Sequence, residues 1–206
     1  TADDLIEVAE DEATEDMYLM VGIRGEERVF GPLFPSVIKR LPWLAINMAT
    51  LFIAVTVVNA FEAVIAGTVA LATFLPLVSG EGGNAGSQTT TVIVRGMALG
   101  EVTVRNGTRA LAKELAAAAI NGAIIGLGTA VVIYLWKQDA AIALAAMLAM
   151  VLNFLMAALS GVLVPLGLKL MRVDPAVASA AFVTAVTDTL GFLFFLGIAT
   201  ILMQWL

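Results

Sequence analysis

The sequence predicts an all-α integral membrane protein with five transmembrane helices, the second of which is broken by proline and glycine, preceded by a cytoplasmic amphipathic acidic helix. Of its 206 residues, 60% are hydrophobic and only 14% are charged, whereas globular domains carry about 25% charged residues. The mean hydropathy is +0.96. Charge-free apolar runs follow one another along the chain, and eight of the 17 acidic residues fall within its first 16 positions.

The composition also excludes several functions. The chain has no cysteine and no histidine, which removes thiolate nucleophiles, the usual zinc sites and imidazole acid–base chemistry. We therefore expect no enzyme. No basic tract indicates nucleic-acid binding. The chain begins at Thr1 with acidic residues rather than a basic segment and an apolar run, so no signal peptide is visible, and we expect a fragment of a longer protein.

Residues 1–34 are predicted to form a cytoplasmic acidic linker helix and its connection to the membrane part. Apolar residues recur every three or four positions between Asp3 and Met20, which predicts one apolar helical face among carboxylates. Like charges four residues apart, such as Glu7 and Asp11, destabilise a helix, and a hard divalent cation would relieve this repulsion. A solvated acidic surface is the alternative. The candidate regulatory metal ligands are Asp4, Glu7, Asp11 and Glu15.

Residues 35–206 are predicted to form the transmembrane domain, since each apolar run approaches or exceeds the ~20 residues needed to cross the hydrocarbon core. Placing the N-terminus in the cytoplasm puts ten of the 11 Lys and Arg residues inside. We therefore expect a multi-pass protein of the plasma or inner membrane with its C-terminus outside. The expected spans are about 41–61, 63–88, 113–136, 140–168 and 175–205.

The second span contains Pro76 and a glycine-rich polar run from Gly80 to Gln88. Proline removes a backbone donor and glycine weakens a helix. Broken backbone at membrane depth is tolerated where it is buried in protein or lines a water-filled cavity. The run therefore predicts a pore-lining segment, with a loop at the membrane surface as the alternative.

Asp188 lies near the middle of the fifth span, in which no other residue from Pro175 to Leu206 is charged. A carboxylate at the centre of a membrane helix costs roughly 2.5–3.5 kcal/mol, and such residues usually mark the path of an ion or proton. We interpret Asp188 as a site for a mobile cation. The alternative is a protonated carboxylic acid hydrogen-bonded to a neighbouring helix.

Oxygen-bearing side chains of the second and fifth spans suit hard cations. Thr184 lies one helical turn before Asp188, so its backbone carbonyl could face the same lumen. One chain offers too few ligands for bare Mg²⁺, but Mg²⁺ keeps several of its waters. Two symmetry-related Asp188 side chains would match its charge, which favours a homodimer. The other oxygen-bearing side chains are Ser79, Asn84, Ser87, Gln88, Thr187 and Thr189.

The second span resembles a known family. Pro76, Gly82-Gly83-Asn84, Gly86 and Gln88, followed by Val94-Arg95-Gly96 and Leu99-Gly100-Glu101, are similar to the motif of MgtE-type magnesium channels. The likeness extends to the acidic helix, the five apolar spans and the aspartate in the last span.

This resemblance implies a homodimer whose second and fifth helices line a Mg²⁺ pore. It implies that Asp188 binds the hydrated ion, that the backbone around Thr184 assists, and that Gly83, Asn84 and Ser87 approach the pore; we add Gln88 to this lining. It also implies cytoplasmic regulatory domains, which this sequence lacks. Glu81 stands where an apolar residue is expected.

Two further functions remain open. A proton-coupled secondary transporter would use Asp188 to carry protons. An intramembrane aspartyl enzyme would need two facing carboxylates, and only Asp188 lies deep in a span. A divalent-cation channel is the leading hypothesis.

Overall fold

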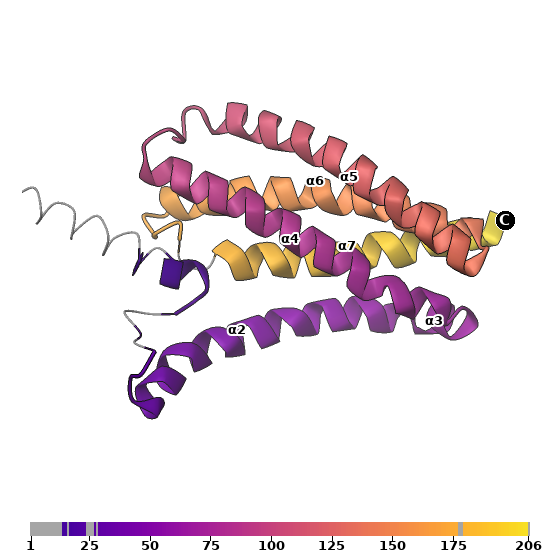
Figure 1. The fold of residues 1–206 in the computed structure, drawn as a ribbon, viewed down its shortest axis with the longest axis horizontal. Coiled ribbons are helices and arrows are strands. Elements are labelled where there is room, and N and C mark those ends of the chain that lie inside the picture. Colours follow the sequence, from indigo (N-terminus) through magenta and orange to yellow (C-terminus); the bar gives the residue numbers. More distant parts are fainter. Residues whose placement is uncertain (1–13, 16, 24–26, 28, 177–178, 206) are drawn as a thin grey trace, which may run out of the picture.

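A computed structural model describes residues 14–15, 17–23, 27, 29–176 and 179–205 of the chain. Within these residues the fold is helical, without strands, as expected from the sequence (Figure 1). The acidic residues Asp4, Glu7 and Asp11 lie outside the described residues. The helices are α2 (Leu33–Ala60), α3 (Glu62–Gly67), α4 (Ala70–Ala98), α5 (Gly107–Lys137), α6 (Ala140–Leu170) and α7 (Ser179–Trp205).

Four helices of the described chain are long and apolar enough to cross a membrane, namely α2, α5, α6 and the part of α7 from Ala181 to Gln204. They coincide with four of the expected spans. α4 is equally long, with 29 residues, but its polar run keeps it from qualifying by composition. The multi-pass character is therefore clear, and the fifth crossing, by α4, stays a prediction.

The expected break in the second span is not confirmed. α4 continues as one helix through Pro76 and the glycine-rich run, and helical geometry is interrupted earlier, at Thr68, where φ is −142° and ψ is 79°. Pro76 removes one backbone donor without ending the helix. Two of the glycines, Gly82 and Gly86, lie where α4 meets other helices: an ideal Cβ at Gly86 would lie 2.4 Å from Val183 of α7. Close helix packing in membranes favours such small residues.

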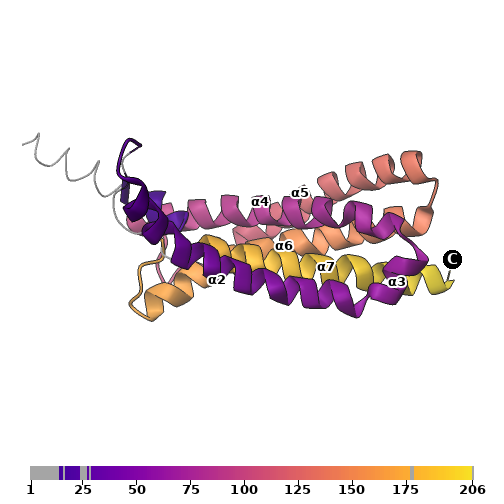
Figure 2. The same ribbon diagram turned by 90° about the horizontal axis from the view of Figure 1, so that it is seen from below.

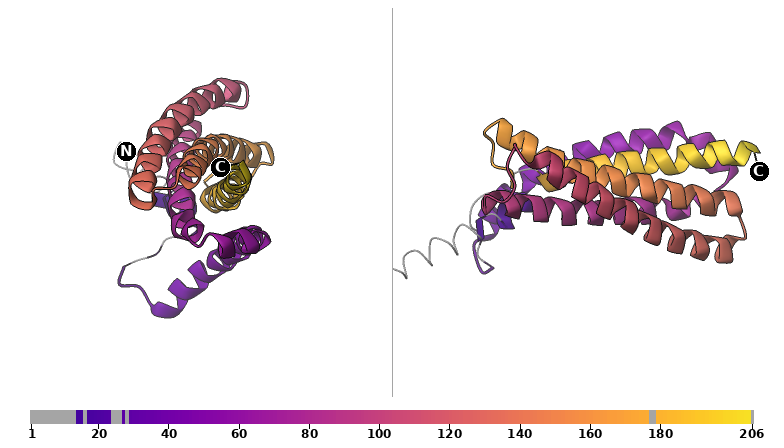
Figure 3. Two further views of the ribbon diagram at one scale, coloured as in Figure 1. Left: turned by 90° about the vertical axis from the view of Figure 1, so that its right-hand side faces the viewer. Right: turned by 90° about the horizontal axis from the view of Figure 1, so that it is seen from above.

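α6 lies at the centre of the bundle, where it contacts α4, α5 and α7. α4 also packs along α7, and α2 contacts α7 from the edge of the bundle (Figures 2 and 3). Toward the ends of α6 and α4 that join α5 and α3, a buried apolar cluster includes Leu71, Phe74, Ala145 and Phe195. The arrangement places α4 and α7, the two helices with the candidate site residues, against one common neighbour.

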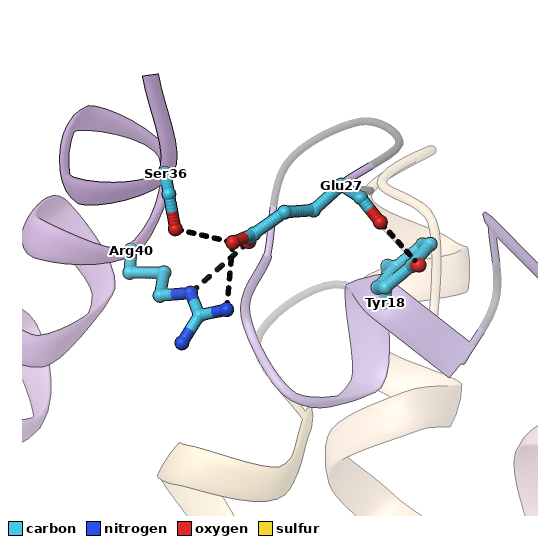
Figure 4. A network of polar contacts seen from close by, with 4 residues as sticks. All are labelled: Tyr18, Glu27, Ser36 and Arg40. Atoms are coloured by element: carbon cyan, nitrogen blue, oxygen red, sulfur yellow. Dashed lines mark hydrogen bonds and ion pairs between the residues drawn. The ribbon is translucent and has the colours of Figure 1, made fainter. Parts of the chain in front are cut away.

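Glu27 fixes the connection from the acidic segment to α2 (Figure 4). Tyr18 donates its hydroxyl hydrogen bond to the Glu27 backbone carbonyl at 2.8 Å. Arg40 of α2 donates to both carboxylate oxygens, at 2.6 and 3.0 Å, and Ser36 also donates to this carboxylate. The hydrogen bonds from Arg40 and from Ser36 lower the pKa of Glu27 below its ordinary value. The start of α2 is thereby tied to the segment that precedes it.

Glu27 should make this connection sensitive to acid. Because its pKa is lowered in the folded chain, the contact stabilises above the ordinary pKa of glutamate, about 4.3, and is lost as the pH falls through the lowered value. We expect hydrogen exchange of the amides near residues 29–36, corrected for intrinsic rate, to accelerate over that window. Glu27→Gln should exchange fast already at neutral pH and show no such transition. A transition that persists in Glu27→Gln would contradict this role.

Gly126 and Gly128 of α5 provide a matched test of helix packing. An ideal Cβ at Gly126 would lie 2.9 Å from the Met147 backbone carbonyl of α6, whereas one at Gly128 meets nothing within 4 Å. We expect Gly126→Ala to lower the free energy of unfolding by about 1–3 kcal/mol through overpacking, and Gly128→Ala to raise it by up to about 1 kcal/mol, since alanine favours the helix over glycine. Unfolding of the detergent-solubilised protein measures both. Equal effects would show that α5 does not pack on α6 in this register.

Candidate functional site

Asp188 lies in α7 and is turned into the bundle. The residue is 8% exposed, and its carboxylate oxygen Oδ1 accepts a hydrogen bond from the Ser79 hydroxyl of α4. Among the described residues no Lys or Arg forms an ion pair with it. A carboxylate can accept about four hydrogen bonds, so most of its capacity is left for a proton, water or a cation.

The backbone next to Asp188 offers further oxygen atoms. Thr187 is fully buried, and its hydroxyl donates to the carbonyls of Val183 at 3.1 Å and Thr184 at 3.0 Å. The Thr184 carbonyl, assigned to the metal from the sequence, therefore accepts this hydrogen bond in addition to the helical bond from the amide four residues later. Gly83 of α4 lies opposite, where an ideal Cβ would be 4.0 Å from the Thr187 hydroxyl oxygen.

One face of α4 is polar and uncovered. Gly80, Asn84, Ser87, Gln88 and Thr91 are exposed in this chain. They recur at spacings of three or four residues, with Ser87 and Gln88 adjacent, which places them on one helical face. The opposite face is buried against α6 and α7. Uncovered polar groups are costly in hydrocarbon. In a bilayer this face therefore requires water or another protein surface beside it.

The structure brings only some of the predicted site residues together. Asp188 meets α4 at Ser79, and Gly83 lies beside Thr187, one position before Asp188. Asn84, Ser87 and Gln88 lie on the uncovered face of α4 instead. Glu81, two residues after Ser79, is half-buried.

The proposed regulatory metal ligands are not gathered in the part that the structure describes. Glu15 is exposed, and no group of three or more acidic side chains among the described residues could hold a metal ion. The other three, Asp4, Glu7 and Asp11, lie outside the described ranges.

Sequence reasoning missed two polar groups between helices. Asn153 of α6 is fully buried and donates to the Val78 carbonyl of α4 at 2.9 Å. Glu114 of α5 accepts from Lys113 at 2.8 Å and, more weakly, from Thr89 of α4 at 3.4 Å. A lone amide in the middle of the long apolar run 140–168 was the available signal for Asn153, since such a group needs a partner in the membrane.

The fold and the site together define a multi-pass helical membrane protein with a carboxylate inside its bundle and an oxygen-rich face on one helix. A family model described as a divalent cation transporter, MgtE, matches residues 75–198. The chain belongs to the MgtE family.

Three curated relatives, each named magnesium transporter MgtE, match almost the whole chain. The protein of Bacillus subtilis strain 168 is 32% identical over 201 residues, covering 97% of this chain and 44% of the relative. That of Enterococcus faecalis is 31% identical over 205 residues, covering 100% of this chain and 45% of the relative. That of Thermus thermophilus is 29% identical over 206 residues, covering 99% of this chain and 46% of the relative. The chain thus spans less than half the length of these relatives.

Proposed function

We propose that this chain forms the pore part of a magnesium channel, in which two copies create a path for hydrated Mg²⁺ on their two-fold axis, lined by α4 and α7. The observation that supports this most directly is the uncovered polar face of α4 in a chain whose neighbouring helices are apolar enough to span a membrane. Lipid is a poor neighbour for that face, whereas a water-filled path satisfies it.

Asp188 is the residue to which we assign ion binding. Its carboxylate is buried, has no cationic partner in the described chain and keeps free acceptor sites. Two such carboxylates, one from each copy, supply a charge of −2 that balances the charge of +2 on the ion. Mg²⁺ dehydrates reluctantly, so the carboxylates bind its water shell. The Thr184 carbonyl assists from the preceding turn of α7.

The remaining lining residues lie on α4. Gly83 lies beside Thr187, where an added Cβ would make only an ordinary contact at 4.0 Å, and Asn84, Ser87 and Gln88 present side-chain oxygen atoms from the uncovered face. Oxygen ligands of this kind suit hard cations. In this proposal they contact the water shell of the passing ion.

The distribution of basic residues supports an N-terminus in the cytoplasm and a C-terminus outside. The starts of α2, α5 and α7 and the ends of α4 and α6 lie at one end of the bundle (Figure 1). Lys39, Arg40, Arg95, Arg109 and Lys169 belong to these segments, and Lys137 lies in the last turn of α5, at the other end. Positive residues favour the cytoplasmic side.

A proton-coupled divalent-cation transporter is the second candidate. The burial of Asp188 beside one neutral donor, the Ser79 hydroxyl, would also suit a carboxyl group that takes up and releases a proton. Current that flows down the Mg²⁺ gradient without a proton gradient supports the channel, and flux strictly coupled to protons supports the transporter.

Replacing Asp188 tests the assignment. We expect Asp188→Ala to abolish Mg²⁺ flux into liposomes that contain the purified protein, while its elution as an assembled dimer is retained. The matched control is Asp139→Asn, since Asp139 caps α6 by accepting from the amides of Ala141 and Ile142, and asparagine is an equally good cap. Native flux in Asp188→Ala would show that the ion does not need this carboxylate.

The acidic segment is proposed to bind regulatory Mg²⁺ through Asp4, Glu7, Asp11 and Glu15. Because the bound cation would relieve repulsion between carboxylates, millimolar Mg²⁺ should slow proteolytic cleavage within residues 3–20 of the reconstituted protein. Potassium at equal ionic strength is the control for screening. Cleavage that is unchanged by Mg²⁺ would favour a solvated acidic surface.

A further inference from the structure

Asn153 is a polar side chain enclosed between three helices. It belongs to α6, has no exposed surface, and its amide nitrogen Nδ2 donates to the Val78 carbonyl of α4 at 2.9 Å. Its oxygen Oδ1 is buried and has no hydrogen-bond partner among the described atoms. A half-satisfied amide costs stability in a low-dielectric interior. An apolar side chain would avoid this cost, so packing alone does not explain the residue.

Glycines on two different helices make room for the amide. An ideal Cβ at Gly82 of α4 would lie 2.1 Å from Asn153 Nδ2, and one at Gly191 of α7 would lie 2.6 Å from the same nitrogen. Real Cβ atoms do not approach other atoms so closely. The Asn153 side chain therefore fits between α4 and α7 only because both present bare backbone to it.

Two residues that Asn153 contacts, Val78 of α4 and Gly191 of α7, lie close in the chain to Ser79 and to Asp188, respectively. Val78 immediately precedes Ser79, which donates to the Asp188 carboxylate. Gly191 follows Asp188 by three residues and therefore shares its side of α7. Asn153 thus contacts the turn of α4 that presents the hydroxyl and the turn of α7 that presents the carboxylate.

We propose that Asn153 is a positioning residue that sets the register of α4 against α7 and thereby the placement of the Asp188 carboxylate beside Ser79. The inference deepens the proposed function, since it names the group that orients the proposed ion-binding carboxylate. Asn153 acts through Val78 and the two glycines. In this role it determines how the carboxylate meets an ion, and Asp188 itself remains the binding group.

The absence of native cysteine allows a direct probe of this geometry. In Ser79→Cys protein, a thiolate and the Asp188 carboxylate would together bind Cd²⁺, a soft cation with affinity for thiolates. Cd²⁺ affinity is read from the ultraviolet absorption of the cadmium–thiolate bond in detergent solution. This readout reports the mutual placement of α4 and α7 and requires no transport. Asp188→Asn in the same background confirms that the carboxylate contributes.

Two pairs of variants in the Ser79→Cys background carry the test. Asn153→Leu removes the amide, and its control Ser160→Ala removes a buried hydroxyl of α6 that donates only within its own helix, to the Met156 and Ala157 carbonyls. Gly191→Ala displaces the amide without changing it, and its control is Gly197→Ala, where a Cβ meets nothing within 4 Å. The second pair keeps the test decisive where Asn153→Leu fails to fold.

We expect Asn153→Leu and Gly191→Ala each to weaken Cd²⁺ binding about tenfold, the effect of losing one well-placed ligand interaction, while both controls stay within about twofold. A Cd²⁺ affinity equal to that of the Ser79→Cys parent, in folded Asn153→Leu or in folded Gly191→Ala, would overturn the proposal. The outcome is separable from the proposed function: loss of Cd²⁺ affinity together with native Mg²⁺ flux in Asp188→Ala would support the positioning role and reject Asp188 as the transport site.

Discussion

The lack of water inside a bilayer is the constraint on which this structure depends. Backbone and side-chain polar groups there must find partners within the protein or beside a water-filled path. α4 meets this constraint in two ways. Gly82 and Gly86 lie against α6 and α7, where Asn153, Thr187 and Asp188 are buried, and its oxygen-bearing face is exposed. The proposed pore rests on this exposed, oxygen-bearing face of α4.

The apolar spans, and the presence of the charged residue Asp188 within the last of them, were predictable because both depend on local sequence. An apolar run of sufficient length identifies α2, α5, α6 and α7 without knowledge of their neighbours, and a charge within such a run is visible by itself. The pairing of Asp188 with Ser79 was not predictable in this way, since the two residues are separated by 109 positions and only the packing of α4 on α7 brings them together. Assignment of ion binding to either residue stays a proposal.

The interpretation of the glycine-rich run was misleading because glycine has two opposite uses. It weakens an isolated helix, which predicted a break, but it also permits close approach of another helix, which is what Gly82 and Gly86 do. Only the neighbours, Asn153 and Val183, decide between these uses. The Glu27 contact was missed for a related reason. The sequence of the segment before α2 indicates only a connection, and the hydrogen bonds between Arg40 of α2 and the Glu27 carboxylate depend on how the two segments pack.

The order of contacts along the chain has a consequence for biogenesis. The main partners of α4 are α6 and α7, which the ribosome synthesises after it, and α4 is the long helix of this bundle that lacks the apolar character of a span. A polar segment of this kind does not partition stably into lipid alone. If α4 crosses the membrane as predicted, it would therefore be buried only after α6 and α7 have been synthesised, and the bundle would close late in biogenesis.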